Sequence, residues 1–231
     1  MQKLKILEED NHIIVVEKPV NVPSQQDKTG DMDMLEIIKK YLKSTYNKPG
    51  NVYLGLVHRL DRPVGGVMVF AKTSKAASRL SEEIRNKKFE KVYLAIIDGK
   101  LEKKQGVLED YLLKNQKTNT SKVVSENVKN SKYAKLEYEV LMYQDEIDLS
   151  VVKIKLHTGR HHQIRVQFAS RGHSLYGDQK YGTRGRGKQI CLWAYQLSFE
   201  HPTKKQWLSY KCLPEKIGSW KILENIENAE L

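Results

Sequence analysis

The chain has 231 residues, and its 40 Lys and Arg against 28 Asp and Glu give a formal net charge of +12. With 39% hydrophobic residues it can bury a sizeable core, which excludes a disordered chain or a coiled coil. Its apolar stretches fall far short of the roughly 20 residues of a membrane-spanning helix, and its first ten residues lack the apolar core of a secretory signal. Cys191 and Cys212 show no CxxC pair or disulfide framework. We therefore expect a cytoplasmic protein without a membrane partner.

The basic excess needs an anionic partner or another reason. Nucleic-acid binders are typically basic, because each phosphate that Lys or Arg neutralises releases condensed counterions. A lysine-rich protein that is merely well solvated fits the charge about equally well. The choice between the two must therefore come from motifs.

Strands and helices are predicted from the first residues onward. A β-branched run at residues 13–17, ended by Pro19, indicates a short strand. Asp33 and Glu36 resemble a capping box, and apolar residues at helical spacing follow them. A helix to about residue 44 is therefore expected.

Further along the chain, buried strands and a second helix are predicted. Residues 66–73 read as a buried strand, and Ser74 is the expected cap of the helix that follows. Residues 92–98 read as another strand. Strict alternation at residues 134–142 and 152–156 is typical of strands with one buried face, and we expect these two to pair in antiparallel fashion.

The stretch at residues 114–132 is rich in Lys, Asn, Ser and Thr, which predicts a solvated hairpin or loop. Strand runs dominate the chain, and the helices follow no regular βαβ rhythm. We therefore expect an α+β fold with an extended, mainly antiparallel mixed sheet and flanking helices. Residues 1–231 are expected to form a single domain.

The segment VHRLDRPVGGVMVFAK, at residues 57–72, concentrates charge directly before a glycine pair and a buried strand. Asp61 lies close to Arg59 and Arg62, and nearby positive charge favours an ionised carboxylate. An ionised aspartate can act as a nucleophile. The glycines permit positive φ or close approach of another backbone or a ligand, which suits a turn that presents Asp61 at a cleft. A surface ion-pair cluster is the alternative interpretation.

The segment LHTGRHHQIRVQFASRG, at residues 156–172, begins where an alternating strand ends. We expect a turn at Thr158 and then a helix. Planar donors for a carboxylate or for phosphates come from Arg160, Arg165 and Arg171. His157 and His161 lie four residues apart, but they straddle a strand-to-turn junction without an HExxH pattern, so we expect no metal site.

The segment FEKVYLAIIDG, at residues 89–99, places Lys91 and Tyr93 on one face of a predicted strand. One interpretation of Tyr93 is ordinary sheet packing. The other is a ring against which a flipped-out base stacks, with a hydroxyl able to take part in proton transfer.

Together these segments closely resemble the RluA family of RNA pseudouridine synthases. The resemblance covers nearly the whole chain and rests on IIVVEKPVNVPSQ, HRLD followed by glycines, the K-x-Y strand, TGR-x-HQIR, SLYGDQKYG and LWAYQLSFEHP. Several motifs in the right order are far more specific than any single one.

The resemblance implies an isomerase that breaks the glycosidic bond of a uridine in RNA, turns the base and rejoins it through carbon 5. Asp61 aligns with the family's catalytic aspartate, which attacks either the ribose or the uracil ring. Tyr93 aligns with the tyrosine placed against the base and implicated in proton removal, and Arg165 with the arginine that pairs with the aspartate. No cofactor is expected, in line with the missing Walker and GxGxxG motifs.

The resemblance also implies contacts to the RNA. Arg59 aligns with the arginine thought to enter the RNA stack and hold the target base out, and Ile164 with an apolar wall beside the uracil. Plain core is the alternative interpretation of Ile164. Further substrate contacts are expected from His58, Arg62, Arg160 and Gln163.

The chain departs from the family pattern at several positions. Val64 and the two glycines after it stand where Thr-Ser-Gly is often found, and Asn21 stands where glycine is common. His161 and Gln167 also replace usual residues. Because the catalytic pattern starts near residue 10, we expect no additional N-terminal RNA-binding domain. Candidate RNA contacts, or else solvated loops, are residues 114–132, Arg184, Arg186 and Lys188.

The sequence thus predicts a monomeric, cofactor-free RNA pseudouridine synthase that acts on ribosomal or transfer RNA. The main alternative is a non-catalytic RNA-binding or ribosome-assembly protein on the same fold. A DNA-directed protein is disfavoured, because no helix-turn-helix or zinc-finger pattern is present.

Overall fold

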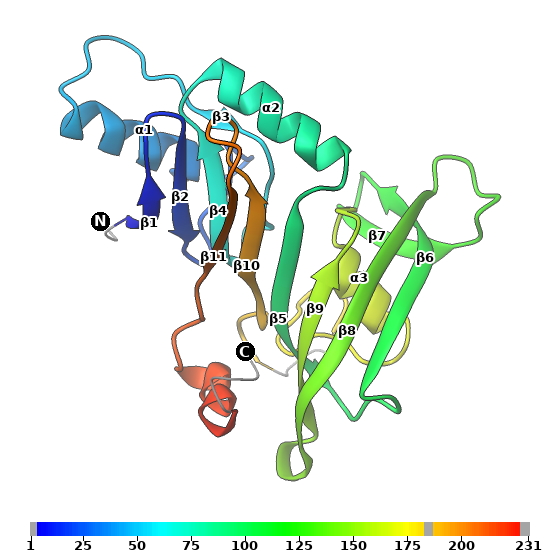
Figure 1. Cartoon of the computed structure of the whole chain (residues 1–231). Coiled ribbons are helices and arrows are strands. Elements are labelled where there is room, and N and C mark those ends of the chain that lie inside the picture. Colours follow the sequence, from blue (N-terminus) through cyan, green and yellow to red (C-terminus); the bar gives the residue numbers. More distant parts are fainter. Residues whose placement is uncertain (1–3, 183–186, 227–231) are drawn as a thin grey trace. The chain divides into compact units, whose positions relative to one another are not determined.

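The computed structural model describes residues 4–182 and 187–226 (Figure 1). The chain divides into two compact units. Unit 1 comprises Met1–Glu90 and Ala194–Leu213, and unit 2 comprises Lys91–Trp193 and Pro214–Leu231. Each unit is built mainly from antiparallel strand pairs, with helices beside them. This arrangement confirms the predicted α+β fold class.

Unit 1 has the strand order β1-β2-β4-β10, with β3 pairing β4 and β11 pairing β10. Its elements are β1 (Lys5–Glu9), β2 (Ile13–Lys18), α1 (Met34–Thr45), β3 (Gly55–Leu56), β4 (Gly65–Ala71), α2 (Ser74–Arg85), β10 (Leu192–Glu200, which begins in unit 2) and β11 (Trp207–Lys211). Every residue of β4 is buried, as expected of the apolar run in this segment. Helix α2 contacts β3 and β4 (Figure 1).

Unit 2 has the strand order β5-β9-β8-β6-β7. Its elements are β5 (Glu90–Asp98, whose first residue belongs to unit 1), β6 (Gln105–Asn115), β7 (Thr120–Val124), β8 (Lys132–Gln144), the 3-10 turn η1 (Asp145–Ile147), β9 (Leu149–Leu156), α3 (Gln163–Ala169) and the 3-10 helix η2 (Gly218–Asn225). Strands β8 and β9 pair in antiparallel fashion, as their alternation predicted. The lysine-rich stretch forms the end of the β6–β7 hairpin and the loop after it, and α3 contacts both of these strands.

Local signals placed the first two helices well. Asp33 caps α1 by accepting a hydrogen bond from the Glu36 amide at 2.9 Å, as predicted. The cap of α2 is Thr73 and not Ser74, because the Thr73 hydroxyl accepts the Ala76 amide at 3.2 Å. Two neighbouring residues that can both cap leave an uncertainty of one position.

The glycine pair that begins β4 has a packing reason. Gly66 has a φ of +124°, and a Cβ there would lie 2.2 Å from the Ala194 carbonyl oxygen. Only glycine allows β4 to approach this part of β10 so closely. Both uses expected for the glycines, positive φ and close backbone approach, are thus found at Gly66.

A half-buried aspartate and a buried histidine join two turns of unit 1. His201 is 1% exposed, and its Nδ1 accepts the amides of Thr203 and Lys204 at 3.1 and 2.8 Å. The ring proton is therefore on Nε2, which donates to Asp10 at 2.8 Å. Asp10 also accepts the His12 and Ile13 amides at 2.7 and 2.9 Å. The β1–β2 turn is thereby fastened to the β10–β11 turn.

No helix in the described residues is long and apolar enough to cross a membrane. Cys191 and Cys212 are buried free thiols.

Asp10→Asn should destabilise the protein in a pH-dependent manner. Burial raises the pKa of Asp10, but the amides of His12 and Ile13 and the contacts with Lys204 and His201 outweigh burial and hold it below its usual value. A carboxyl whose pKa is lowered by folding stabilises the folded state at neutral pH and loses that effect as the pH falls. We expect the substitution to lower the free energy of unfolding by about 1–3 kcal/mol at pH 7.

Urea unfolding at several pH values measures the difference from wild type, which should shrink below about pH 4. Glu82→Gln, at an exposed carboxylate on α2, is the matched control. A deficit that stays constant down to pH 3 would contradict the ionised Asp10 contact.

Candidate active site

Asp61 lies in the segment of residues 57–64, which ends in a tight turn at residues 61–64 and which we call the HRLD turn. It connects β3 to the fully buried β4. The Val64 amide donates to the Asp61 carbonyl at 3.0 Å, which closes the turn. Leu60 and Val64 are 7% and 2% exposed, whereas Asp61 is half-buried. Two apolar anchors thus hold a carboxylate that remains partly accessible.

Ser24 fixes the backbone beside Asp61. Its hydroxyl donates to the Leu60 carbonyl at 2.8 Å and accepts the Leu60 amide at 3.1 Å. Ser24 is 5% exposed, so no bulk water competes for these bonds. The Ser24 hydroxyl thus bonds both the amide and the carbonyl of Leu60, as the backbone of a neighbouring strand would. These two bonds restrict the backbone of Leu60, the residue before Asp61.

Lys18 is the most unusual group near the turn, because it is 0% exposed at the end of β2. Its Nζ donates to the carbonyls of Pro19, Val22 and Arg62 at 2.9, 2.6 and 3.0 Å. Burial lowers the pKa of Lys18 to about 7, the charge of Asp61 acts to raise it, and the charge of Arg62 acts to lower it. A buried amine thus ties the segment after β2 to the residue after Asp61.

The segment after β2 owes its path to a left-handed residue. Asn21 has a φ of +65°, which asparagine tolerates better than most residues. Glycine adopts this left-handed backbone readily as well, in line with the family resemblance, in which glycine is expected at this position. The bend lets the Pro19 and Val22 carbonyls both reach the Lys18 amine.

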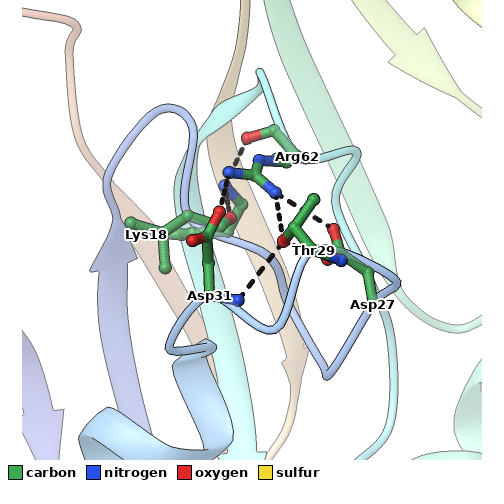
Figure 2. Close-up of polar contacts among 6 residues, drawn as sticks. Lys18, Asp27, Thr29, Asp31 and Arg62 are labelled. Atoms are coloured by element: carbon green, nitrogen blue, oxygen red, sulfur yellow. Dashed lines mark hydrogen bonds and ion pairs between the residues drawn. The ribbon is translucent and has the colours of Figure 1, made fainter.

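The side chain of Arg62 is engaged by the loop before α1 (Figure 2). Its Nη1 donates to Thr29 Oγ1 at 2.8 Å and to Asp27 Oδ2 at 3.3 Å, and its Nη2 bonds Asp31. Arg62 is the largest of the causes that lower the pKa of Asp31. An RNA phosphate would have to compete with these two carboxylates for Arg62, a constraint that the sequence did not indicate.

The two residues before Leu60 differ in exposure. His58 is half-buried, and its Nε2 accepts the Val69 amide of β4 at 3.1 Å. Arg59 is exposed. Arg59 is therefore the residue of the turn best placed to meet a macromolecule, whereas His58 fastens the turn to β4.

In unit 2, Tyr93 lies on β5 and is 9% exposed. It pairs with Ile154 of β9. Lys91, two residues earlier on the same strand face, is half-buried, and burial lowers its pKa. Tyr93 and a poorly solvated amine thus share one face of β5.

Arg165 lies on α3 and is 4% exposed. Its Nε and Nη2 donate to Asp178 Oδ2 and Oδ1 at 2.7 and 2.6 Å, a bidentate arrangement. Asp178 belongs to the motif SLYGDQKYG, to which the sequence assigned no role. Ile164, the preceding residue, is 4% exposed.

Gln163 organises the turn before α3 from a buried position. It is 3% exposed, its Oε1 accepts from Thr158 Oγ1 and the Arg160 amide at 2.8 and 3.0 Å, and its Nε2 donates to the Lys135 carbonyl at 3.1 Å. The Gln163 side-chain amide, which was expected to contact substrate, thus forms hydrogen bonds with three protein groups. Arg160 is exposed, and its Nε donates to the Tyr133 carbonyl at 2.8 Å.

Of the remaining predicted RNA contacts, those in the described residues lie partly on strands and partly in loops. Lys188 is exposed, whereas Arg184 and Arg186 lie outside the described residues. Five lysines of the predicted basic stretch are exposed, namely Lys114, Lys117, Lys122, Lys129 and Lys132. Within residues 4–182 and 187–226, no group of three His, Cys, Asp or Glu could hold a metal ion.

The predicted catalytic residues are divided between the units. Asp61 belongs to unit 1, and Tyr93 and Arg165 belong to unit 2. Sequence reasoning missed Lys18, Ser24 and Asp178. A signal existed for each of them, because Lys18 and Ser24 lie in IIVVEKPVNVPSQ and Asp178 lies in SLYGDQKYG, two of the motifs that carry the family resemblance.

Lys18→Met should change how stability depends on pH. The pKa of Lys18 is about 7 in the folded chain and 10.5 without the protein environment, so between these values the unfolded state binds more protons. The free energy of unfolding of the wild type should therefore rise with pH, relative to Lys18→Met, by up to about 1.4 kcal/mol per pH unit.

Urea unfolding of both proteins at pH 6, 8 and 10 measures this difference, in which the other titrating groups cancel. Lys75→Met, at an exposed lysine on α2, is the control and should follow the wild type. If the free energies of unfolding of the wild type and Lys18→Met changed in parallel with pH, burial would not lower the pKa of Lys18 and the prediction would be wrong.

Comparisons with known proteins identify the family. A family model described as RNA pseudouridylate synthase matches residues 12–170. An uncharacterized RNA pseudouridine synthase of Aquifex aeolicus is 34% identical, covering 90% of this chain and 68% of the relative. The dual-specificity RNA pseudouridine synthase RluA of Pasteurella multocida is 30% identical, covering 91% of this chain and 93% of the relative.

Other relatives are longer. The ribosomal large subunit pseudouridine synthase C of Haemophilus influenzae is 31% identical, and the match covers 89% of this chain but 64% of that protein. Among solved structures, Human RNA Pseudouridylate Synthase Domain Containing 1 superposes with a TM-score of 0.75 at 24% identity, covering 95% of this chain and 86% of that one. The likeness shows a shared fold. Because the family model matches more than half of the chain, the chain belongs to the RNA pseudouridylate synthase family, whose members are isomerases that modify RNA.

Proposed function

We propose that this protein converts uridine in structured RNA, ribosomal or transfer, to pseudouridine. The observation that carries the proposal is the HRLD turn, in which a partly accessible Asp61 is held on a backbone fixed by Ser24 and Lys18. Two relatives support the substrate class, since one is named as a ribosomal large subunit pseudouridine synthase and the other as a dual-specificity RNA pseudouridine synthase.

The reaction needs few chemical groups. The bond from ribose carbon 1 to uracil nitrogen 1 breaks, a bond from the same carbon to uracil carbon 5 forms, and a proton leaves carbon 5 while nitrogen 1 gains one. Asp61 is the proposed nucleophile, toward either the ribose or the uracil ring. Because atoms and electrons balance within the substrate, no cofactor is required.

The other roles follow the family alignment. Tyr93 is proposed to stack on the base and assist proton removal, and its buried ring on β5 suits a fixed stacking surface. Arg165 is proposed to pair with Asp61. Ile164 is proposed to lie beside the uracil as an apolar wall.

RNA recognition is proposed to rest on the exposed basic residues. Arg59 is exposed in the turn and is proposed to replace the extruded base in the RNA stack. The exposed lysines of residues 114–132 and Arg160 are proposed to contact phosphates. His58, Arg62 and Gln163 already bond protein groups, so we propose that they act by shaping the site around the RNA.

We further propose that both units form one catalytic domain, which works as a monomer in the cytoplasm. A non-catalytic RNA-binding or ribosome-assembly role is the competing function. Both roles give salt-sensitive RNA binding, because counterion release accompanies any phosphate contact. Only turnover separates them.

Asp61→Asn should abolish turnover and leave RNA binding intact. The amide keeps the size of the side chain but is not a nucleophile, so we expect the rate to fall at least about a thousandfold. The assay is tritium release from RNA labelled at uracil carbon 5, with ribosomal and transfer RNA purified separately from cells that lack the protein. The RNA pool that releases tritium identifies the substrate class.

Glu82→Gln serves as the matched carboxylate control and should release tritium at the wild-type rate. Release by Asp61→Asn equal to wild type would reject the assigned nucleophile. Binding without release from either pool, by the wild type itself, would favour the non-catalytic role.

A further inference from the structure

The ion pair between Arg165 and Asp178 is nearly excluded from solvent. The side chains are 5% and 0% exposed, and two hydrogen bonds of 2.7 and 2.6 Å join them. Desolvation makes such a pair a poor source of stability, and apolar residues of similar volume often serve as well. Conformational specificity is therefore the better reason for its presence.

Asp178 does more than neutralise Arg165. Its Oδ1 also accepts the amides of Lys180 and Tyr181 at 2.9 and 3.2 Å. Burial raises the pKa of Asp178, but the hydrogen bonds and charge of Arg165 and these two amides outweigh burial and lower it. One ionised carboxylate thus orders the turn after Gly177 and grips the guanidinium at the same time.

The turn that Asp178 orders also places the Tyr181 ring against the Arg165 guanidinium. The Tyr181 ring centroid lies 5.3 Å from Arg165 Cζ. Its hydroxyl accepts the Ser121 amide of β7 at 2.6 Å and lies 2.8 Å from His162 Nδ1. His162, the residue before α3, has a φ of +53°, a conformation uncommon outside glycine and asparagine. The start of α3, the strand β7 and the turn therefore meet at Tyr181.

This arrangement fixes the orientation of a planar group. A guanidinium presents one edge through Nε and Nη2 and a second through Nη1 and Nη2. Asp178 accepts hydrogen bonds from the first edge, and the Tyr181 ring packs against the guanidinium and restricts the orientation of its plane. The direction of the second edge is then determined by the backbone of α3.

We propose that Asp178 is a positioning residue for Arg165: it holds the guanidinium in one plane and direction, so that the second edge is presented to the reacting carboxylate without rearrangement. This inference rests on the proposed function, in which Arg165 pairs with Asp61. Misplacing a catalytic group by about 1 Å can cost on the order of 10²-fold in rate.

A second arginine–aspartate pair beside the same helix provides the matched control. Arg171, just after α3, donates to Asp110 through Nη1 and Nη2 at 2.9 and 3.1 Å. This pair is bidentate too, but the Arg171 side chain is 37% exposed. Asp110 also accepts from Gln167 Nε2 at 2.7 Å, a bond that an asparagine oxygen can still accept, so Asp110→Asn weakens the same kind of arginine contact without touching Arg165.

The test measures single-turnover rates and RNA dissociation constants separately. We expect Asp178→Asn to lower the single-turnover rate by about 10²-fold while the dissociation constant changes less than about twofold. Asp110→Asn should leave both unchanged. A rate within twofold of wild type for a folded Asp178→Asn protein would overturn the proposal.

A double-substitution cycle covers the case in which Asp178→Asn alone does not fold. Removing both charges, in Arg165→Met/Asp178→Asn, leaves no unpaired buried charge. If Asp178 acts through Arg165, this protein should turn over at the rate of Arg165→Met, within about twofold. A further tenfold loss in the double variant would show an independent role and overturn the proposal.

Nitrogen-15 NMR gives a readout that does not need turnover. The Nε proton of Arg165, identified by its absence in Arg165→Met, should exchange slowly with water in the wild type because Asp178 accepts it. Rapid exchange would overturn the proposed fixation. If the wild type modifies no RNA but this proton is protected, the proposed function fails while the positioning geometry stands.

Discussion

The buried amine of Lys18 is the constraint on which the HRLD turn depends. An amine that is 0% exposed needs hydrogen-bond acceptors, and three backbone carbonyls supply them. Two come from the segment that bends at Asn21, and the third comes from Arg62. Because the buried Lys18 amine needs these three acceptors, it links the end of β2 to Arg62, the residue after Asp61. The Ser24 hydrogen bonds fix Leu60, the residue before Asp61.

Unit 2 also contains a buried ionisable side chain that fixes nearby backbone, but it is a carboxylate and not an amine. Asp178 is an almost completely buried carboxylate. Its oxygens accept hydrogen bonds from Arg165 and from two amides of its own turn. In each unit a buried ionisable side chain fixes backbone next to a residue that we propose to be catalytic. The exposed residues proposed to meet RNA, such as Arg59 and Arg160, are thus different residues from Lys18 and Asp178, the buried groups that set geometry.

The parts of this organisation that short-range patterns determine were predictable. The α1 cap at Asp33, the buried β4 and the antiparallel β8–β9 pair follow from local spacing and alternation. Gln163 shows the limit, because its position in a charged motif suggested substrate contact, whereas tertiary packing buries it against Thr158. The pairing of Asp178 with Arg165 spans 13 residues and required the turn geometry to be known.

Hydrogen exchange at the Leu60 amide tests the central claim, that buried contacts of the segment after β2 hold the turn around Asp61. This amide donates to the buried Ser24 hydroxyl. The account predicts that it is strongly protected in the wild type, and that Ser24→Ala speeds its exchange while the β4 amide of Val69, which donates to His58, keeps its protection. Unprotected exchange at Leu60 in the wild type, or no change on Ser24→Ala, would contradict the account.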